Sequence, residues 1–358
     1  MYTITNIKND QRSLEFDIND IDVGLLNAVR RVIISDIPNV AVYFDSYDIN
    51  NNDIKFIKNT SVLHNEFTCH RVSLIPLFFD KDEVNNFDPD NYKFVIEEKG
   101  PKIVTTKHIK IFDNNDEEYS KEFQNKIFPV DDITGDHIII TKLKTEEEVI
   151  HLEFRGRIGT AKHHSRWCPV STCTYFNNID DNLVSKEIKK LDTKDLNQFN
   201  TLDKYRLFQK NEYGEPNSFH MIIESECRLT PSYIFTKACE ILINKVDNFL
   251  EKHIVDVIDQ ESHLYAITIL GENHTLGNML QVLIFNLYVR MKNIVDFIGY
   301  VQPHPLEEKI IFKIRFYKEM DNNLIQEFLE EATEKVKDEI KKIPVDVFNQ
   351  SKIKKTRK

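Results

Sequence analysis

The sequence has little of what marks several specialised classes of protein. Its five Cys among 358 residues are an odd and sparse set, which argues against a disulfide framework and favours a reduced, intracellular protein. Nine Gly and eleven Pro are too few for a collagen-like or low-complexity fibre. Basic residues are outnumbered by acidic ones, with 47 Lys and Arg against 58 Asp and Glu. Because cations that neutralise phosphates supply most nucleic-acid affinity, autonomous wrapping of nucleic acid is disfavoured.

Long apolar runs are missing as well. No stretch approaches the roughly 18 apolar residues of a membrane-spanning helix, and residues 1–20 lack the apolar segment of a signal peptide. We therefore expect no membrane attachment. What is present is a hydrophobic fraction of 41% and an aromatic fraction of 11%, enough to build a core. The length of 358 residues predicts about two to three domains.

Apolar periodicity predicts strands and amphipathic helices in a recurring order. Helices are expected between Asp22 and Pro38, over 60–76, over 231–252, after an N-cap at Thr275, and over 322–342. Strands are expected at 12–18, 40–44, 137–143, 149–154, 219–224, 264–270, 294–301 and 309–317. Segments 80–128 and 178–218 are polar and poorly periodic, which is typical of inserts.

Two parts of the chain begin alike. A strand and an acidic turn precede Gly24, and a strand and a turn precede Gly277. Glycine in a helix costs about 1 kcal/mol relative to alanine, so its presence in both first turns predicts a close approach of another group to the backbone. Each part also closes with a long amphipathic helix. The order strand, helix, strand is common, so periodicity alone leaves open a chance match.

The residues themselves carry a resemblance. Residues 274–280 (HTLGNML), followed by 297–307 (FIGYVQPHPLE), resemble the signature of the eleventh-subunit family of RNA polymerase II, which includes the archaeal L-type proteins. Residues 25–42 (LLNAVRRVIISDIPNVAV) resemble the third-subunit family, which includes the archaeal D-type proteins. Two further blocks support the second likeness: 65–77, and 156–170 with its RGRIGTAKHH and WCPV runs. Both families are related to the N-terminal domain of the bacterial α subunit.

The resemblance implies an α+β fold. We expect two bacterial-α-like dimerisation units, each a sheet with long amphipathic helices, and an inserted, mainly β platform domain. The expected division is a third-subunit-like dimerisation domain at 1–78 and 219–253, a platform at 79–218, a linker at 254–262, an eleventh-subunit-like dimerisation domain at 263–345, and a basic tail at 346–358. The tail is interpreted as solubilising, with nucleic-acid contact or a nuclear address as alternatives.

The same resemblance implies a non-catalytic assembly subunit of a DNA-directed RNA polymerase, whose two α-like halves pair within one chain. Its implied partners are the largest and second-largest polymerase subunits and small polymerase subunits, with no specific DNA contact. No cofactor is expected on this chain, since the family's magnesium is bound by the largest subunit. Fused subunits of this kind and AT-biased residue usage indicate a large nucleocytoplasmic DNA virus, hence the virion and a cytoplasmic factory; a cellular protein would be nuclear.

Candidate site residues follow from the matched blocks. Docking of the large subunits is expected at Asn27, Arg30, Arg31, His70 and Arg71. Arginine suits an interface because its planar guanidinium makes several directed contacts; solvated arginines or a local polar cluster are the simpler alternatives. Pairing of the two halves is expected through a mostly apolar set of helix residues. They are Leu26, Val29, Ile33, Leu276, Gly277, Asn278, Met279, Leu280, Leu283, Phe328 and Leu329.

No metal ligands and no catalytic residues are expected. His163, His164, Cys168 and Cys173 lack the paired spacing of a structural zinc site. No Cys lies between Cys69 and Cys168, so the zinc loop or iron–sulfur cluster of some third-subunit relatives has no counterpart in the insert. Phosphate-loop and nucleophile-elbow motifs are also missing. The alternative function is a stand-alone enzyme using a His/Cys cluster such as His163 and Cys168; a regulatory mimic that sequesters large subunits is a third.

Overall fold

The computed structural model describes residues 2–191, 195–259, 261–346 and 348. The fold is mixed α/β and divides into two compact units. Unit 1 comprises Met1–Ile34, Thr172–Glu224 and Pro231–Lys358, and unit 2 comprises Ser35–Ser171 and Ser225–Thr230.

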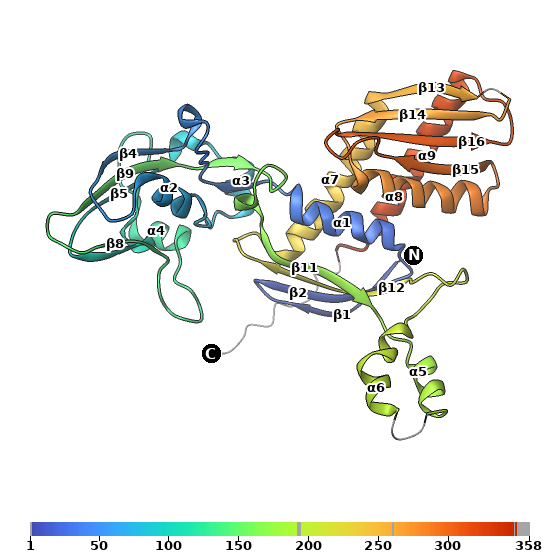
Figure 1. The fold of residues 1–358 in the computed structure, drawn as a ribbon, viewed down its shortest axis with the longest axis horizontal. Coiled ribbons are helices and arrows are strands. Elements are labelled where there is room, and N and C mark those ends of the chain that lie inside the picture. Colours follow the sequence, from blue (N-terminus) through green and yellow to red (C-terminus); the bar gives the residue numbers. More distant parts are fainter. Residues whose placement is uncertain (1, 192–194, 260, 347, 349–358) are drawn as a thin grey trace. The chain divides into compact units, whose positions relative to one another are not determined.

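Unit 1 contains a first four-stranded sheet in the order β1-β2-β12-β11. Its strands are β1 (Thr3–Asn9), β2 (Ser13–Asn19), β11 (Val170–Asn177) and β12 (Ser218–Ser225). The alternation in β2 buries Leu14, Phe16 and Ile18 completely. Two helices, α1 (Val23–Ser35) and α7 (Pro231–Lys252), lie over this sheet (Figure 1). We call these elements the first half.

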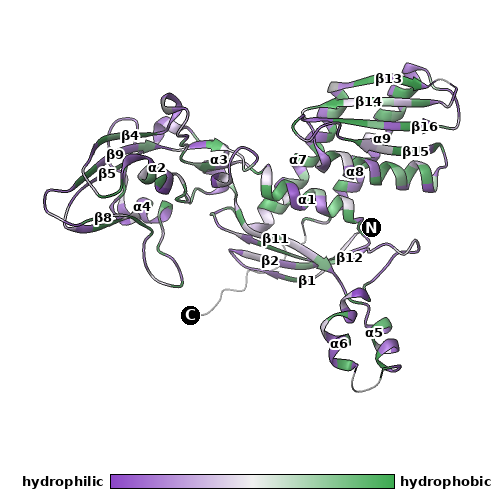
Figure 2. Ribbon diagram, in the orientation of Figure 1, coloured by the Kyte–Doolittle hydropathy of each residue, from purple (hydrophilic) through white to green (hydrophobic). Residues whose placement is uncertain are grey.

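The second half of unit 1 repeats this plan. Its antiparallel sheet has the order β13-β14-β16-β15, built from β13 (His253–Asp259), β14 (Leu264–Leu270), β15 (Val295–Val301) and β16 (Lys309–Phe316). Two helices pack on it: α8 (His274–Ile284), which continues as a π-helix over Phe285–Met291, and α9 (Asn322–Lys341). In Figure 2, hydrophobic and hydrophilic colours alternate along α7, α8 and α9, as expected for amphipathic helices.

Two short helices, α5 (Asp181–Ile188) and α6 (Leu196–Thr201), occupy the polar stretch between β11 and β12. Asp180 caps α5 by accepting hydrogen bonds from the backbone N–H groups of Asn182 and Leu183. The loop that follows α6 returns to β12, and its Glu215 contacts Arg290 of the second half. This polar stretch therefore reaches from the first half to the second.

Unit 2 is mainly β. Its largest sheet has the order β4-β9-β5-β7, with β4 (Ile54–Asn59), β5 (Lys93–Lys99), β7 (Lys110–Phe112) and β9 (Val149–Arg155). Two-stranded sheets pair β6 (Lys102–Thr105) with β8 (Ile139–Leu143), and β3 (Asn39–Ala41) with β10 (Arg157–Gly159). Three helices complete it: α2 (Asn65–Ser73), α3 (Lys81–Asn85) and α4 (Lys121–Ile127). Phe94 and Phe154 stack in its core, 5.0 Å apart.

The division differs from the predicted domain bounds at both ends of the insert. Residues 35–78 belong to unit 2, because β3 pairs with β10 and β4 pairs with β9. Residues 172–218 belong to unit 1 instead, where β11 joins the first sheet at β12. The predicted insert therefore begins too late and ends too late in the sequence.

Three local predictions are corrected. The expected linker at 254–262 is largely strand β13, since its backbone pairs with β14 from His253 to Asp259. The helix expected over 60–76 is only Asn65–Ser73. The N-cap of α8 is Asn273, whose side chain accepts a hydrogen bond from the Thr275 backbone N–H, rather than Thr275 itself.

The predicted tail at 346–358 also begins too early. Phe348 is 2% exposed, and its ring lies 4.9 Å from that of Phe16 and 5.4 Å from that of Phe235. It is therefore a core residue of unit 1. Residues 349–358, which hold the basic positions, lie outside the described residues.

Candidate functional site

The N-terminal turns of α1 and α8 are tightly packed at their glycines. A Cβ added at Gly24 would lie 3.3 Å from Asn278 Nδ2 and 3.3 Å from Val282 Cγ2, both on α8. A Cβ added at Gly277 would lie 2.7 Å from the ring of Tyr300. The predicted close approach is thus confirmed at both positions. The neighbours differ, since Gly24 faces the other half and Gly277 faces a strand of its own half.

Polar side chains also join α1 to α8. Arg31 Nε donates to Thr275 Oγ1 at 2.8 Å, and Asn286 Nδ2 donates to Asp22 Oδ2 at 3.2 Å. The other oxygen of Asp22 caps α1 by accepting from the Gly24 N–H at 2.7 Å. Burial raises the pKa of Asp22, although the hydrogen bond from Gly24 acts in the opposite direction.

The loop before β12 forms an ion pair with the π-helix of the second half. Arg290 makes a two-pronged contact with Glu215, at 2.6 Å and 3.0 Å, and its guanidinium lies 4.2 Å from the ring centre of Tyr213. The same Arg290 donates to Asn286 at 2.9 Å. The hydrogen bond from Arg290 is the main cause that lowers the pKa of Glu215 to about 2. A bidentate pair of this kind fixes orientation as well as distance.

The long helices of the two halves make ion pairs. Lys337 of α9 lies 2.9 Å from Asp247 of α7, and Lys245 of α7 lies 3.3 Å from Glu272, just before α8. At the N-terminus, Tyr2 donates from its hydroxyl to Glu339 of α9 at 2.8 Å. Burial, followed by the charge of Glu339, raises the pKa of Tyr2. These contacts connect residues far apart in the sequence.

The residues predicted to pair the halves are nearly all buried. Ten of the eleven are in the core, namely Leu26, Val29, Ile33, Leu276, Gly277, Met279, Leu280, Leu283, Phe328 and Leu329. Asn278 is half-buried and lies near Gly24. Phe328 stands apart, because its ring contacts, with Tyr288 and Phe316 at 5.0 Å each, lie within the second half.

The residues predicted to dock large subunits fall into both units. In unit 1, the half-buried Arg30 donates from Nε to Asn27 Oδ1 at 3.0 Å, while Arg31 is held by Thr275. In unit 2, His70 is exposed. Arg71 donates to the backbone carbonyls of Ile139 and Ile140 at 2.6 Å and 2.9 Å, which ties α2 to β8. Their role in docking stays a prediction.

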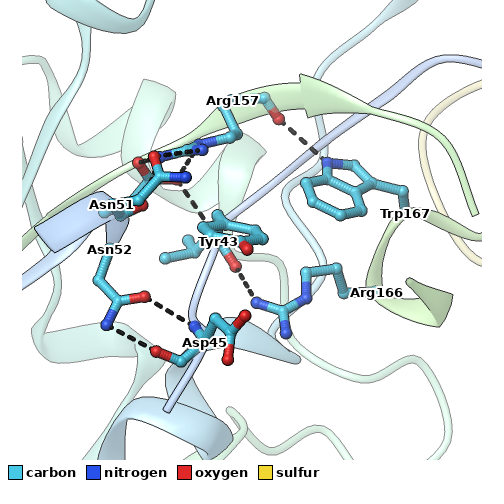
Figure 3. Close-up of polar contacts among 9 residues, drawn as sticks. Tyr43, Asp45, Asn51, Asn52, Arg157, Arg166 and Trp167 are labelled. Atoms are coloured by element: carbon cyan, nitrogen blue, oxygen red, sulfur yellow. Dashed lines mark hydrogen bonds and ion pairs between the residues drawn. The ribbon is translucent and has the colours of Figure 1, made fainter. Parts of the chain in front are cut away.

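Unit 2 also holds a cluster of arginines and aromatic rings that the sequence does not predict as a site, although three of its residues lie in the matched block 156–170. Figure 3 shows Tyr43 between Arg157 and Arg166, with Trp167 beside them. The guanidinium carbons lie 4.4 Å and 5.5 Å from the Tyr43 ring centre, and the Trp167 ring stacks on Tyr43 at 6.1 Å. Cation–π contacts of this kind are favourable when partly desolvated. In the sequence, Arg157, Arg166 and Trp167 lie in the matched block 156–170, whereas nothing near Tyr43 indicates that it joins them.

The backbone around this cluster shows why the sequence folds that way. A Cβ added at Gly159 would lie 2.4 Å from the Trp167 ring, so only glycine lets β10 lie against the indole. Trp167 Nε1 donates back to the Arg157 carbonyl at 3.1 Å. Arg157 in turn donates to Asp53 Oδ2 at 2.8 Å and to the Asn51 carbonyl at 2.9 Å. Strand β10 and the loop around Asn51 are thereby fixed together.

The predicted His/Cys cluster is used structurally. His164 Nδ1 accepts from both the backbone N–H and Nε of Arg166, each at 3.1 Å, and Cys168 Sγ donates to the Val170 carbonyl at 3.2 Å. Within the described part of the chain, no three His, Cys, Asp or Glu side chains are grouped so that they could hold a metal ion. Among the same residues, no helix combines the length and apolar character needed to cross a bilayer.

Comparisons with known proteins give one consistent result. The family model described as the RNA polymerase Rpb3/Rpb11 dimerisation domain matches residues 15–246, and a second model of the same description matches residues 265–344. DNA-directed RNA polymerase subunit Rpo3 of Methanobrevibacter smithii is 26% identical over 66% of this chain and 92% of that protein. The Rpo3 subunit of Pyrococcus horikoshii is 25% identical over 70% of this chain and 98% of that protein. DNA-directed RNA polymerases I and III subunit RPAC1 of Saccharomyces cerevisiae is 30% identical over 46% of this chain and 54% of that protein.

Proposed function

The chain belongs to the family of the RNA polymerase Rpb3/Rpb11 dimerisation domain, and on that premise we propose that it is a non-catalytic assembly subunit of a DNA-directed RNA polymerase. One observation carries the proposal: two segments of this one family, at 15–246 and 265–344, occur in a single chain. Its relatives are named as polymerase subunits. In this role the chain is a scaffold, and the magnesium expected for nucleotide addition is bound by the largest subunit.

The two segments pair with each other inside the chain, in our proposal. Support comes from the packing of Gly24 against α8, the hydrogen bond from Arg31 to Thr275, and the ion pair between Lys337 and Asp247. Because the halves share a chain, the effective concentration of one half around the other is about millimolar for a short linker. Pairing would then not depend on the supply of a second subunit. The two halves, expressed separately, should still associate; if they do not, the pairing proposal is wrong.

Docking of the largest and second-largest subunits is assigned in this proposal to the polar surface of α1, with a contribution from α2 of unit 2. Arg30 is pre-oriented by Asn27, which lowers the entropy that binding must remove. On α2, Arg71 is occupied by the carbonyls of β8, so His70 is the freer group there. Small polymerase subunits are further expected partners.

Co-expression with the two large subunits tests the assembly role. The full chain should co-purify with them in stoichiometric amounts, and the purified chain alone should incorporate no nucleotide. Arg30→Ala should lower the recovery of the large subunits several-fold. Arg206→Ala is the matched control, because Arg206 is an exposed arginine of the same unit that pairs only locally with Asp203.

The outcomes separate the possible roles. Failure of the full chain to co-purify would overturn the assembly role. Co-purification in a complex that makes no RNA would favour a mimic that sequesters large subunits. Equal recovery with Arg30→Ala and Arg206→Ala would remove α1 from the docking surface while leaving the scaffold role intact.

A viral setting is the finer part of the proposal. It is supported by the fusion of two family segments in one chain and by the frequent Ile, Lys and Asn residues that an AT-biased genome encodes. An antibody against the chain should then detect it in purified virions together with the large subunits. Detection only in nuclei of uninfected cells would instead identify a cellular polymerase.

A further inference from the structure

The arginine and aromatic cluster of unit 2 opens onto two neighbouring hollows. One is a cavity of about 600 Å³ bordered by Tyr43, Arg157, Arg166 and Trp167. The other is a groove of about 690 Å³ along the edge strand β4 and the start of α2. Both are lined by Phe44 and Ser46, so the two hollows are neighbours. His70, which the docking proposal uses, also borders the cavity; the other lining residues have no role in that proposal.

The cavity presents N–H donors. Arg166 uses one N–H on each terminal nitrogen for the carbonyls of Val42 and Phe44, at 2.9 Å and 2.8 Å, and its Nε for His164. A guanidinium has five N–H groups, so two remain for a ligand. His164 accepts at Nδ1, which places its own proton on Nε2 and makes that nitrogen a donor. The ring is therefore neutral and fixed in one tautomer.

The charge of the cavity is also unbalanced. Arg157 is paired with Asp53, but among the described residues no carboxylate lies within ion-pair distance of Arg166. Asp45 is the single acidic residue among the lining side chains, against two arginines and three histidines, His70, His163 and His164. Asp45 and Asp53 act on Arg166 only from beyond ion-pair distance. A partly buried guanidinium with free donors and no direct ion pair favours an anionic ligand, and arginine recognises a carboxylate through two parallel hydrogen bonds.

The groove next to it suits an apolar side chain. Phe44, Ile54, Phe56 and Cys69 line it, with Lys55 and Glu66 at its polar positions. Strand β4 is at the sheet edge, so its outer backbone groups are available to an extended segment. An anion site beside an apolar groove matches a protein segment with an acidic residue next to a hydrophobic one. Phosphate of nucleic acid matches less well, because the chain carries a formal charge of −11.

We propose that this surface of unit 2 binds an extended acidic segment of a partner protein, with a carboxylate on Arg166 and His164 and an adjacent apolar side chain in the groove. The carboxylate accepts from the two remaining N–H groups of Arg166 and from His164 Nε2. Trp167, Tyr43 and Arg157 hold the cavity open and in shape. The proposal adds a partner to the assembly role but does not depend on it.

The single tryptophan of the chain makes the proposal directly testable, because Trp167 borders the cavity. The probe is a synthetic peptide that alternates Asp with Phe and Leu and contains no Trp. Its twin carries Asn at every Asp position. Titrated into the full-length chain, the Asp peptide should change the Trp167 fluorescence saturably, and the Asn peptide should bind at least about tenfold more weakly, since a charge-assisted hydrogen bond is stronger than a neutral one.

Two variants locate the contact. Arg166→Gln should weaken binding of the Asp peptide about tenfold or more. Arg155→Gln removes the same charge from unit 2 at a residue that does not line the cavity, and it should bind like the wild type. His164→Ala, which removes the proposed Nε2 donor, gives a second measurement if circular dichroism shows that Arg166→Gln is misfolded, and it should weaken binding severalfold.

Three results would overturn the proposal: no saturable response to the Asp peptide, equal affinity for the Asn peptide, or equal weakening by Arg155→Gln and Arg166→Gln. Displacement of the Asp peptide by a lower concentration of oligothymidylate would show that the surface is a phosphate site instead. None of these results bears on co-purification with the large subunits, so the two proposals fail separately.

Discussion

The two halves of unit 1 have the same plan and are held differently. Each is a four-stranded antiparallel sheet under two helices, and each has a glycine in the first turn of its first helix. The first half, however, takes Phe348 from the end of the second half into its core, beside Phe16 and Phe235. In the second half, the aromatic contacts of Phe328 are with Phe316 and Tyr288 of the same half. The likeness follows from the shared family, whereas the asymmetry means that the first half depends on the second.

The largest expected effect breaks this dependence. Phe348→Ala should lower the free energy of unfolding by about 3–5 kcal/mol, because it removes a fully buried ring from a packed core. The loss of stability should be greatest in the first half. Hydrogen exchange should show faster exchange in β2 and α7 than in β14 and β16. Phe297→Ala is the matched control, since Phe297 is 46% exposed, and it should cost less than about 1 kcal/mol. Uniform loss of protection in both halves would contradict the asymmetry.

Elements defined by local sequence patterns could be predicted, whereas those that depend on contacts between distant residues could not. Helices α7 and α9 are predicted to within one residue, because apolar periodicity over twenty residues is a local signal. Strand β13 is mistaken for a linker because its seven residues become a strand only through pairing with β14. Phe348 is assigned to a tail, since nothing near it in sequence indicates that its neighbours are Phe16 and Phe235.

The candidate sites also differ in how far the sequence predicts them. The glycines at 24 and 277 indicate close packing through local pattern alone, and the structure places a neighbour at each. The cavity around Tyr43 gives only a partial signal, because the block 156–170 supplies one wall and nothing in the pattern indicates the other. Arg157 and its partner Asp53 are 104 residues apart, and Arg166 reaches carbonyls more than 120 residues away. Such clusters are products of tertiary structure, so only the folded chain reveals them.

A smaller effect sharpens the comparison at the two glycines. Gly277→Ala should destabilise the protein more than Gly24→Ala, because the added Cβ meets the Tyr300 ring at 2.7 Å rather than neighbours at 3.1–3.3 Å. Overpacking costs about 1–3 kcal/mol, and the gain in helix propensity offsets about 1 kcal/mol at both positions. Gly24→Ala should therefore be nearly neutral in chemical denaturation.

Relief of the clash provides the control for that pair. Adding Tyr300→Leu to Gly277→Ala should recover part of the lost stability, whereas Tyr300→Leu alone should destabilise. The hydrogen bond between His274 and Tyr300, 3.1 Å long, holds the ring in place and keeps it from moving aside. If Gly24→Ala proves the more harmful substitution, the contact between the halves is tighter than the contact within the second half.

The smallest effect concerns the ion pair that joins the halves at Arg290. The pKa of Glu215 is lowered from 4.5 to about 2, so its contribution to stability is full above pH 4.5 and is lost as the pH falls toward 2. Glu215→Gln should remove that part of the pH dependence. The loss should be below about 1 kcal/mol at low ionic strength, since the Glu215 side chain is 42% exposed and screened by solvent.

The control is Glu187→Gln, which removes a carboxylate paired only with Lys190, three residues away. Unfolding curves between pH 2 and 5 at low and high salt distinguish the two. An unchanged pH profile in Glu215→Gln would mean that the halves are held by packing alone at this point.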